Sequence, residues 1–524
     1  MKLFIVLLTG AFMLATGTSD VFAKKKEKVQ TEAKSDTVQT VSKKRNTQYP
    51  RLFKNKRVVT KKGLITIHKI NDKLYFEFPK SLLGRDFLMG SSVSATSNNT
   101  SGLVGQTMTT PLHIRFAIQE DHIYMQNVTP VSRMDVYSNQ SDISRAVAKS
   151  NITPNMESFK IAAYNMDSTA VVFEVTKFFL ADNKRLPLFD QNSASLEDEK
   201  YGKLELKAIL KKNLSSIRNF YVFDDNLEIN LDMSFYQSLL ANKREVRGGN
   251  VRVKAVYSML LLPEEVMTWR LGDPRLGYTY TKKQKISTEK DGTAFSYLQH
   301  KWNLLPTDKE AYRRGDLVAP RKPVLFYIDS DFPEAWKKAI KEGVNWWNEA
   351  FKMAGFKDAV QTADFPANDT TFYAGNLKYS CIRYVPVNLS KTQSKVWVDP
   401  RSGEIINGTI FVGHDIAKTI ASQRFVQTAQ VDERMRGIQL SEEALLEGIR
   451  LYVAREVGHC LGLADNASAS AAFSVESLRS PEFTRQNGIA SSVMDELPYN
   501  YIAQPQDGKA DFIQNKLGAY DLFA

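Results

Sequence analysis

The segment from Ser441 to Gly462 constrains this 524-residue chain more than any other part of its sequence. Ser441 is a favourable helix N-cap, and the two glutamates that follow it complement the positive end of a helix dipole. Apolar residues then recur at helical spacing until Gly462, a residue type that commonly ends helices. The sequence therefore predicts one long helix, which carries Glu456 and His459 near its end.

The residues at the end of this helix follow the spacing of a zinc-peptidase motif. Zincin helices carry two histidines at i and i+4, and a glutamate after the first histidine activates the metal-bound water. Metzincins add a glycine, a third ligand six residues after the second histidine, and a methionine turn. Glu456, His459 and Gly462 occupy their motif positions, and residue 465 is at the third-ligand position. Met494 lies in a Ser-Val-Met-Asp segment that resembles the methionine turn.

Two positions depart from this metzincin pattern. Arg455 replaces the first histidine, and Asp465 replaces the last ligand. A carboxylate is an ordinary zinc ligand, so Asp465 is compatible with metal binding. The Arg455 guanidinium stays protonated and has no lone pair to offer. Only His459 and Asp465 remain where a catalytic site uses three protein ligands and water, so we expect zinc to bind weakly or not at all.

The sequence leaves two conformations open for Arg455. Its side chain can occupy the metal position and pair with Asp465, with Glu456 also in reach, or it can point to solvent while Asp465 only shapes the turn. If the pair is buried, Asp465→Ala should lower the free energy of unfolding by about 3–5 kcal/mol. An effect below about 0.5 kcal/mol would argue against pairing.

Other donors are not expected to repair the site. Of the six histidines, only His414 is predicted to share a domain with His459, and we expect it at a rim position. Cys460 follows His459 directly, but consecutive side chains on a helix diverge, so a Cys–His nucleophile is not expected. Whether Cys381 and Cys460 form a disulfide is left open.

The surrounding domain is predicted to begin at residue 309. Residues 323–328 predict a short strand, and a helix follows that ends at Gly355. Residues 395–398 and 404–412 predict two strands joined by a turn. In metzincins the region of the second strand is the edge that pairs with an extended peptide. The residues expected to bind substrate there are Gly408, Ile410 and Val412.

Several further segments resemble a family of large secreted zinc metalloproteases that is common in Bacteroidetes. The similar segments are RLGDPRLGY at 270–278, the strand at 323–328 with its following helix, VDPRSGEI at 398–405, and residues 494–505. Members of this family carry two N-terminal domains of unknown function before a metzincin-like catalytic domain. They usually continue beyond the point where this chain stops, so the resemblance implies a truncated C-terminus.

The expected fold class is α+β, with two β-rich N-terminal domains before a metzincin-like domain. The expected parts are a signal peptide (1–23), a basic disordered leader (24–46), a small β domain (47–108), a β-rich domain of unknown function (109–308) and the peptidase-like domain (309–524). Strict alternation at 227–235 predicts a half-buried strand in the second β-rich domain, residues 64–78 predict a hairpin, and residues 171–180 predict another strand.

The N-terminus predicts export. A lysine precedes an apolar run at 3–14, and Val21-Phe22-Ala23 resembles a cleavage site. We expect a location in the periplasm, on the outer-membrane surface or outside the cell, with no transmembrane helix after cleavage. The net charge of +12 is concentrated near the mature N-terminus, where it indicates either contact with an anionic envelope surface or, our preferred interpretation, a solvated leader. Nucleic acid is not an expected partner.

Three functions are compatible with these features. The leading hypothesis is a metallopeptidase homologue that is catalytically inactive but still binds a peptide or protein. The second is an active zinc metalloendopeptidase in which His459 and Asp465 bind the metal, Glu456 is the general base and a third ligand is unidentified. The third is a structural envelope protein or a gene remnant. Zinc content and peptide cleavage distinguish the first two.

Overall fold

The structure, a computed structural model, covers most of the chain from residue 48 onward. It describes residues 48–98, 104–105, 107–128, 134–136, 145–146, 149–189, 196–198, 200, 202–286, 293–369, 371–387, 392–437, 439–508 and 510–524. The expected signal peptide and basic leader lie outside these residues. Among the described helices, none combines the length and the apolar character that crossing a bilayer requires.

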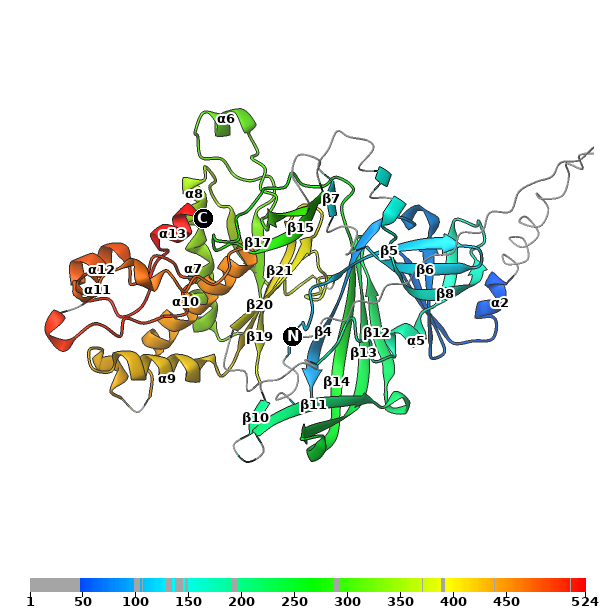
Figure 1. The fold of residues 1–524 in the computed structure, drawn as a ribbon, viewed down its shortest axis with the longest axis horizontal. Coiled ribbons are helices and arrows are strands. Elements are labelled where there is room, and N and C mark those ends of the chain that lie inside the picture. Colours follow the sequence, from blue (N-terminus) through cyan, green and yellow to red (C-terminus); the bar gives the residue numbers. More distant parts are fainter. Residues whose placement is uncertain are drawn as a thin grey trace, which may run out of the picture. The chain divides into compact units, whose positions relative to one another are not determined.

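Strands dominate the first half of the described chain. Its largest sheet, counted over the described residues, has 13 strands in the order β1-β2-β3-β9-β8-β6-β5-β4-β14-β13-β11-β10, with β12 paired to β13 (Figure 1). The strands are β1 (Val58–Lys62), β2 (Thr66–Ile70), β3 (Lys73–Pro79), β4 (Asp86–Thr96), β5 (Leu112–Gln119), β6 (His122–Asn127), β8 (Asn155–Tyr164), β9 (Ala170–Glu174), β10 (Leu196–Asp198), β11 (Gly202–Leu210), β12 (Ser216–Val222), β13 (Asn226–Ala241) and β14 (Arg244–Leu261). Two short helices, α2 (Tyr49–Phe53) and α5 (Thr176–Phe179), accompany them.

Local patterns predicted three segments of this sheet, and one of the three contains an error. The alternation at 227–235 lies within β13, whose apolar side chains enter the core, and the hairpin at 64–78 is β2 and β3. The strand predicted at 171–180 is wrong in its second half, because β9 ends at Glu174 and residues 176–179 form α5. Phe178 and Phe179 of α5 are buried in the same core, which explains why their apolar character resembled a strand.

The strands of the two predicted N-terminal domains alternate within one sheet. β3 pairs with β9, and β4 pairs with both β5 and β14. The predicted boundary at residue 108 therefore does not separate two sheets. A second sheet, in the order β16-β15-β7, contains β7 (Met134–Val136), β15 (Tyr280–Ile286) and β16 (Thr293–Gln299).

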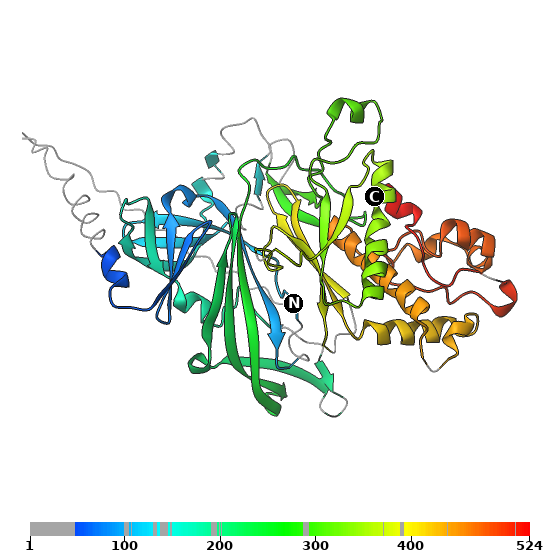
Figure 2. The same ribbon diagram turned by 180° about the vertical axis from the view of Figure 1, so that it is seen from behind.

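The C-terminal part is built on a five-stranded sheet in the order β18-β17-β19-β21-β20. Its strands are β17 (Val324–Ile328), β18 (Val360–Asp364), β19 (Ser380–Val385), β20 (Thr392–Asp399) and β21 (Glu404–Gly413). Only β20 runs antiparallel to its neighbour, and it stands last in the sheet. Figure 2 shows these strands, in yellow and lime, beside the long green strands β13 and β14. Trp397 of β20 packs there on Leu88 and Leu260.

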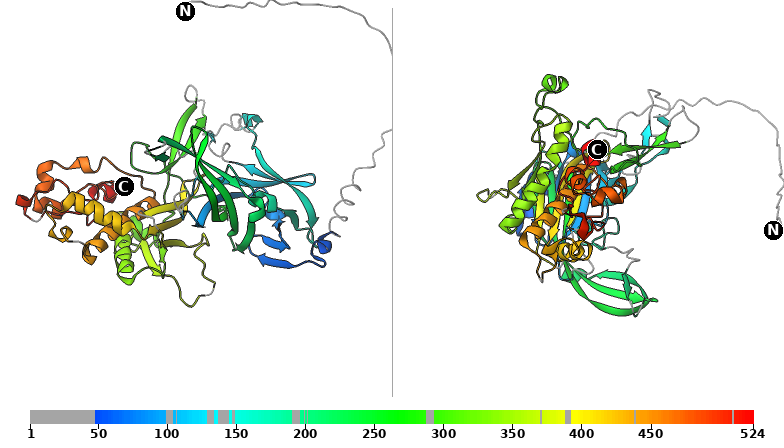
Figure 3. Two further views of the ribbon diagram at one scale, coloured as in Figure 1. Left: turned by 90° about the horizontal axis from the view of Figure 1, so that it is seen from below. Right: turned by 90° about the vertical axis from the view of Figure 1, so that its left-hand side faces the viewer.

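α7 (Glu334–Asn345) and α10 (Glu442–Leu461) pack on the other face of the five-stranded sheet. The other helices of this part are α6 (Lys309–Arg313), α8 (Trp347–Met353), α9 (Ile416–Thr428), α11 (Val475–Arg479), α12 (Pro481–Asn487) and α13 (Ala519–Phe523). Figure 3 shows the orange and red helices gathered away from the strands of the N-terminal half. α7 and α8 form the predicted helix that ends at Gly355, which has a φ of 87°. α7 lies close against α10, because a Cβ on Gly343 would be 2.5 Å from the Arg450 carbonyl oxygen.

Candidate metal site

α10 has the bounds that its sequence predicts. The Ser441 side chain accepts a hydrogen bond from the Ala444 amide, and Gly462 ends the helix in the left-handed conformation with a φ of 102°. A Cβ on Gly462 would also be 2.3 Å from the His300 carbonyl oxygen. Both the backbone conformation and the close approach of another segment therefore require glycine at this position.

The methionine turn lies directly beneath α10. Met494 is fully buried, and its sulfur would be 2.3 Å from a Cβ on Gly458. The Met494 carbonyl oxygen accepts a hydrogen bond from the Asn466 amide at 2.9 Å, which ties the turn to the segment after Asp465. The predicted relation between Met494 and the helix is thus present in the structure.

The segment that follows the helix is held by residues far away in the sequence. The Thr279 amide donates to the Gly462 carbonyl oxygen at 2.8 Å, and the Ala464 amide donates to the Gly277 carbonyl oxygen at 2.9 Å. The RLGDPRLGY segment therefore positions the turn that presents Asp465. Its similarity to the secreted family was visible in the sequence, but its location was not predicted.

Asp521 holds the methionine turn from the other side, and sequence reasoning missed it. Its carboxylate accepts hydrogen bonds from the Ser492 hydroxyl at 2.5 Å and from the Val493 amide at 2.8 Å. Burial of this side chain raises the pKa of Asp521, against the effect of these hydrogen bonds. The sequence does not show this role, because Ser492 and Val493 lie 29 and 28 residues before Asp521 in the chain.

His459 keeps the orientation of a metal ligand. Its Nδ1 lies 3.0 Å from the Leu463 carbonyl oxygen, and because a carbonyl can only accept, Nδ1 must carry the proton. This arrangement leaves Nε2 directed at Asp465, whose Oδ1 lies 3.3 Å away. Histidines that bind metals usually donate their second ring N–H to such a carbonyl or carboxylate.

Arg455 pairs with Asp465, as one of the two predicted conformations requires. Its Nη2 lies 2.7 Å from Asp465 Oδ1, the same oxygen that faces His459. The Arg455 and Asp465 side chains are 22% and 53% exposed, so the pair is partly solvated. The loss of about 3–5 kcal/mol expected for Asp465→Ala in a buried pair therefore does not apply. Arg455 Nε is buried without a hydrogen-bond partner among the described residues, so the contact is made through one nitrogen only.

Glu456, the predicted general base, has a different partner. It is only 6% exposed, and its Oε1 accepts a hydrogen bond from the Thr392 hydroxyl at 2.9 Å. The expectation that Glu456 would join the Arg455 pair is not met by the contacts of the described residues. Thr392 begins β20, so the carboxylate faces the last strand of the sheet.

These residues do not fit a catalytic zinc ion. His459 Nε2 and Asp465 are the donors that converge, and the third motif position contributes a cation. Over the part of the chain that the structure describes, no group of three or more His, Cys, Asp or Glu side chains is placed to hold a metal. The arrangement is an ion pair with a neighbouring imidazole, which can form hydrogen bonds but has no three-ligand metal set.

The predicted substrate strand requires a correction. β21, which contains Gly408, Ile410 and Val412, is hydrogen-bonded to β19 on one side and to β20 on the other, so it has no open edge. Ile410 and Val412 are buried in the core, and a Cβ on Gly408 would be 3.0 Å from the sulfur of Cys460. The error arose because a sequence shows that a strand exists but not which strands flank it.

The remaining candidate donors stay apart from the site. His414 is exposed, and its Nδ1 is hydrogen-bonded to the Tyr384 hydroxyl. Cys381 and Cys460 are both free and buried, and burial raises the pKa of both thiols, to about 12 for Cys381. Neither thiol has the lowered pKa of a reactive cysteine.

Fold and site together define a zincin-like domain, and the family comparisons agree with this class. Residues 437–524 match the family model described as Met-zincin. Residues 47–96 and 105–307 match models described as Domain of unknown function (DUF5118) and Domain of unknown function (DUF5117). The C-terminal region is therefore metzincin-like and of metallopeptidase type, and zinc is the metal of that family. No curated protein and no solved structure matches the chain.

Proposed function

We propose that this protein is an exported metallopeptidase homologue that does not bind catalytic zinc and has kept the ability to bind an extended peptide. One observation carries the proposal: the 2.7 Å ion pair between Arg455 and Asp465 at the place where a metzincin holds its metal. Arg455 and His459 share one carboxylate oxygen of Asp465, the residue at the third-ligand position of the motif.

Electrostatics supports the loss of zinc. A unit positive charge and a divalent ion about 4 Å apart repel each other by roughly 8 kcal/mol at an effective dielectric constant of about 20. Zinc could enter only if Arg455 left Asp465 and turned away from the site. The protein would then still offer His459 and Asp465 alone, which is one ligand fewer than catalytic zinc sites use.

Peptide binding is proposed for β20 in place of β21. β20 has a strand neighbour on one side only, and apart from its pairing with β21, residues 392–398 make no backbone–backbone hydrogen bond with the described chain. Backbone groups at such an edge can add an extended peptide as a further strand. Thr392 places one end of β20 against Glu456, so a peptide on this edge would pass the altered site.

Export is proposed from the N-terminal sequence. Residues 1–23 have the charged, apolar and small-residue sections of a signal peptide. The resemblance to secreted proteases of Bacteroidetes points the same way. The proposed location is the periplasm, the outer-membrane surface or the exterior.

Restoration of the motif tests the loss of zinc. The unaltered protein, dialysed against zinc and then desalted, should contain far less than one zinc per chain by mass spectrometry. Arg455→His with Asp465→His should raise zinc to one per chain, because His459 is already oriented by Leu463. Adding Glu456→Gln to this variant is the matched control: zinc should remain, and any peptide cleavage should be lost.

One zinc per chain in the unaltered protein, together with chelator-sensitive cleavage of a peptide, would contradict the proposal. Peptide binding is measured separately on the unaltered protein, with a panel of fluorescent eight-residue peptides and their backbone N-methylated counterparts. Edge pairing predicts that N-methylation weakens binding at least tenfold. Equal binding of both forms would exclude pairing through the β20 backbone.

A further inference from the structure

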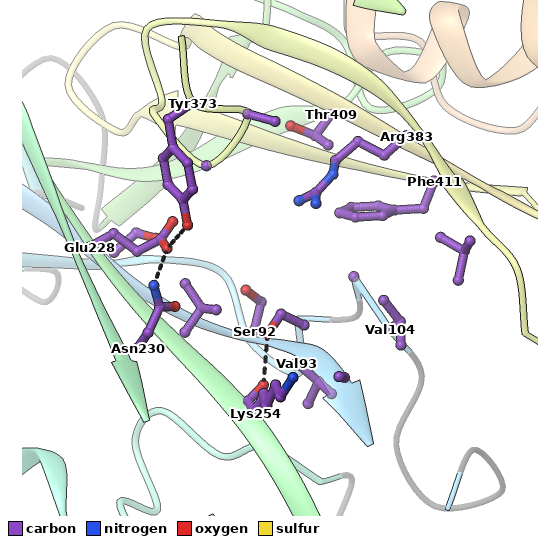
Figure 4. Close-up of a pocket in the computed structure, with 18 of the residues that line it drawn as sticks. Ser92, Val93, Val104, Glu228, Asn230, Lys254, Tyr373, Arg383, Thr409 and Phe411 are labelled. Carbon is purple, nitrogen blue, oxygen red and sulfur yellow. Dashed lines mark hydrogen bonds between the residues drawn. The ribbon is translucent and has the colours of Figure 1, made fainter. Parts of the chain in front are cut away.

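A cavity of about 740 Å³ lies on the far side of the five-stranded sheet from α10. Strands β4, β12, β13 and β14 line it on one side, and β19, β20, β21 and residues 365–377 line it on the other (Figure 4). Thr409 and Phe411 of β21 face this cavity, whereas Ile410 between them is buried in the core next to α10. Because successive side chains on a strand point to opposite faces, the cavity is separate from the altered metal site.

Positive charge is concentrated in this cavity. Its described lining includes four cationic side chains, from four different strands, and one carboxylate. The cations are Arg218 of β12, Lys254 of β14, Arg383 of β19 and Lys395 of β20. None of these four side chains has an ion-pair or hydrogen-bond partner among the residues that the structure describes.

The single carboxylate, Glu228, does not neutralise these cations. It is buried, and its Oε1 accepts hydrogen bonds from the Tyr373 hydroxyl and from the Asn230 amide at 2.5 and 2.8 Å. Burial raises the pKa of Glu228, although Arg383 and Lys395 act against this shift. Figure 4 shows Glu228 and Asn230 on the wall opposite Arg383 and Phe411.

Arg383 and Lys395 are held by aromatic rings. The Arg383 guanidinium carbon lies 5.9 Å from the centroid of the Phe411 ring, and Lys395 Nζ lies 5.2 Å from that of the Trp397 ring. Such contacts orient a cation but supply only part of the stabilisation that an anion provides. Burial lowers the pKa of Lys395 to about 8, and an anion in the cavity would favour its charged form.

We propose that this cavity binds an extended ligand with several carboxylate groups, such as a short acidic peptide segment. Its size is within the range of small-ligand sites. Cations on separate strands suit carboxylates that are spaced along a ligand better than one compact anion. The stacked rings of Tyr221 and Tyr373, with centroids 4.2 Å apart, form an apolar wall for the ligand body. This site depends neither on the loss of zinc nor on the edge of β20.

The first test uses the unaltered protein and changes only the ligand. A fluorescent peptide of four glutamates should bind, and the same peptide with four glutamines should bind at least tenfold more weakly. Raising the salt concentration should weaken binding of the glutamate peptide, since the contacts are electrostatic. No binding of the glutamate peptide, or equal binding of the two peptides, would overturn the proposal.

The second test changes the cavity. Arg383→Gln and Lys395→Gln should each weaken binding of the glutamate peptide at least tenfold. Arg247 and Lys338 are exposed and lie outside the cavity lining, so the control variants Arg247→Gln and Lys338→Gln should leave this affinity unchanged. The melting temperature of each variant is measured beside its affinity, so that lost binding is separated from unfolding. Unchanged binding in both cavity variants would place the peptide elsewhere and refute the proposal.

Competition distinguishes the source of the carboxylates. Displacement of the peptide by citrate at a similar concentration would support the carboxylate chemistry and identify free polycarboxylates as ligands. Displacement by the glutamate peptide alone would support a peptide ligand. Displacement by inorganic phosphate as effective as that by citrate would show a general anion site and would overturn the assignment to carboxylates.

Discussion

Replacing Gly458 by alanine tests how α10 sits on the methionine turn. The new Cβ would lie 2.3 Å from the Met494 sulfur and 2.7 Å from the Trp347 ring. Trp347 cannot easily move away, because its Nε1 donates a hydrogen bond to the Ala454 carbonyl oxygen at 2.8 Å. Met494 is fully buried. The substitution therefore forces a rearrangement of packed groups on both sides.

Two opposing effects set the size of the change. Overpacking of a core by one methyl group destabilises by about 1–3 kcal/mol, and distances this far below van der Waals contact place Gly458→Ala at the upper end. Alanine in the interior of a helix contributes about 1 kcal/mol in the opposite direction. We expect the free energy of unfolding of the C-terminal part to fall by about 2 kcal/mol, which lowers its melting temperature by about 4–8 °C.

The assay is thermal unfolding of the full chain, followed by calorimetry and far-ultraviolet circular dichroism. Gly437→Ala is the matched control in the same region, since the atom nearest to its added Cβ is 3.5 Å away, and its melting temperature should change by no more than about 1–2 °C. If Gly458→Ala raises the melting temperature, as the helix preference alone would, Met494 does not lie beneath this turn of the helix and the predicted packing is refuted.

Two further substitutions test the site and its support. In a double-mutant cycle of Arg455→Met and Asp465→Asn, the coupling energy should be about 0.2–1 kcal/mol and decrease with salt, because the pair is partly exposed; a value above about 3 kcal/mol would show a buried pair. Burial lowers the pKa of His300 to about 4. Between about pH 6.5 and pH 4 the unfolded chain therefore binds a proton at His300 that the folded chain does not bind. The free energy of unfolding should fall by at most about 3 kcal/mol as the pH is lowered over that interval. His300→Gln should flatten this part of the stability curve, and an unchanged slope would exclude His300 as its source.

Short-range signals were sufficient to predict the elements of the candidate site. The Ser441 cap and the Gly462 stop defined α10, and motif spacing placed Glu456 and His459 on it. These predictions succeeded because capping, helical periodicity and left-handed glycine conformations depend on residues within a few positions of one another. The same holds for the alternation in β13, where one face of a strand is buried.

The tertiary structure alone decided which elements meet. The sequence shows that Arg455 cannot bind a metal, but only the folded chain brings it to 2.7 Å from Asp465 and leaves the pair half in solvent. Likewise, the sequence predicts β21 as the second of two strands joined by a turn, and only its pairing with β19 in the folded chain removes its open edge. Strand order, ion pairs and cavities join residues that are distant along the chain, and their free energies depend on distances and burial that no local pattern encodes.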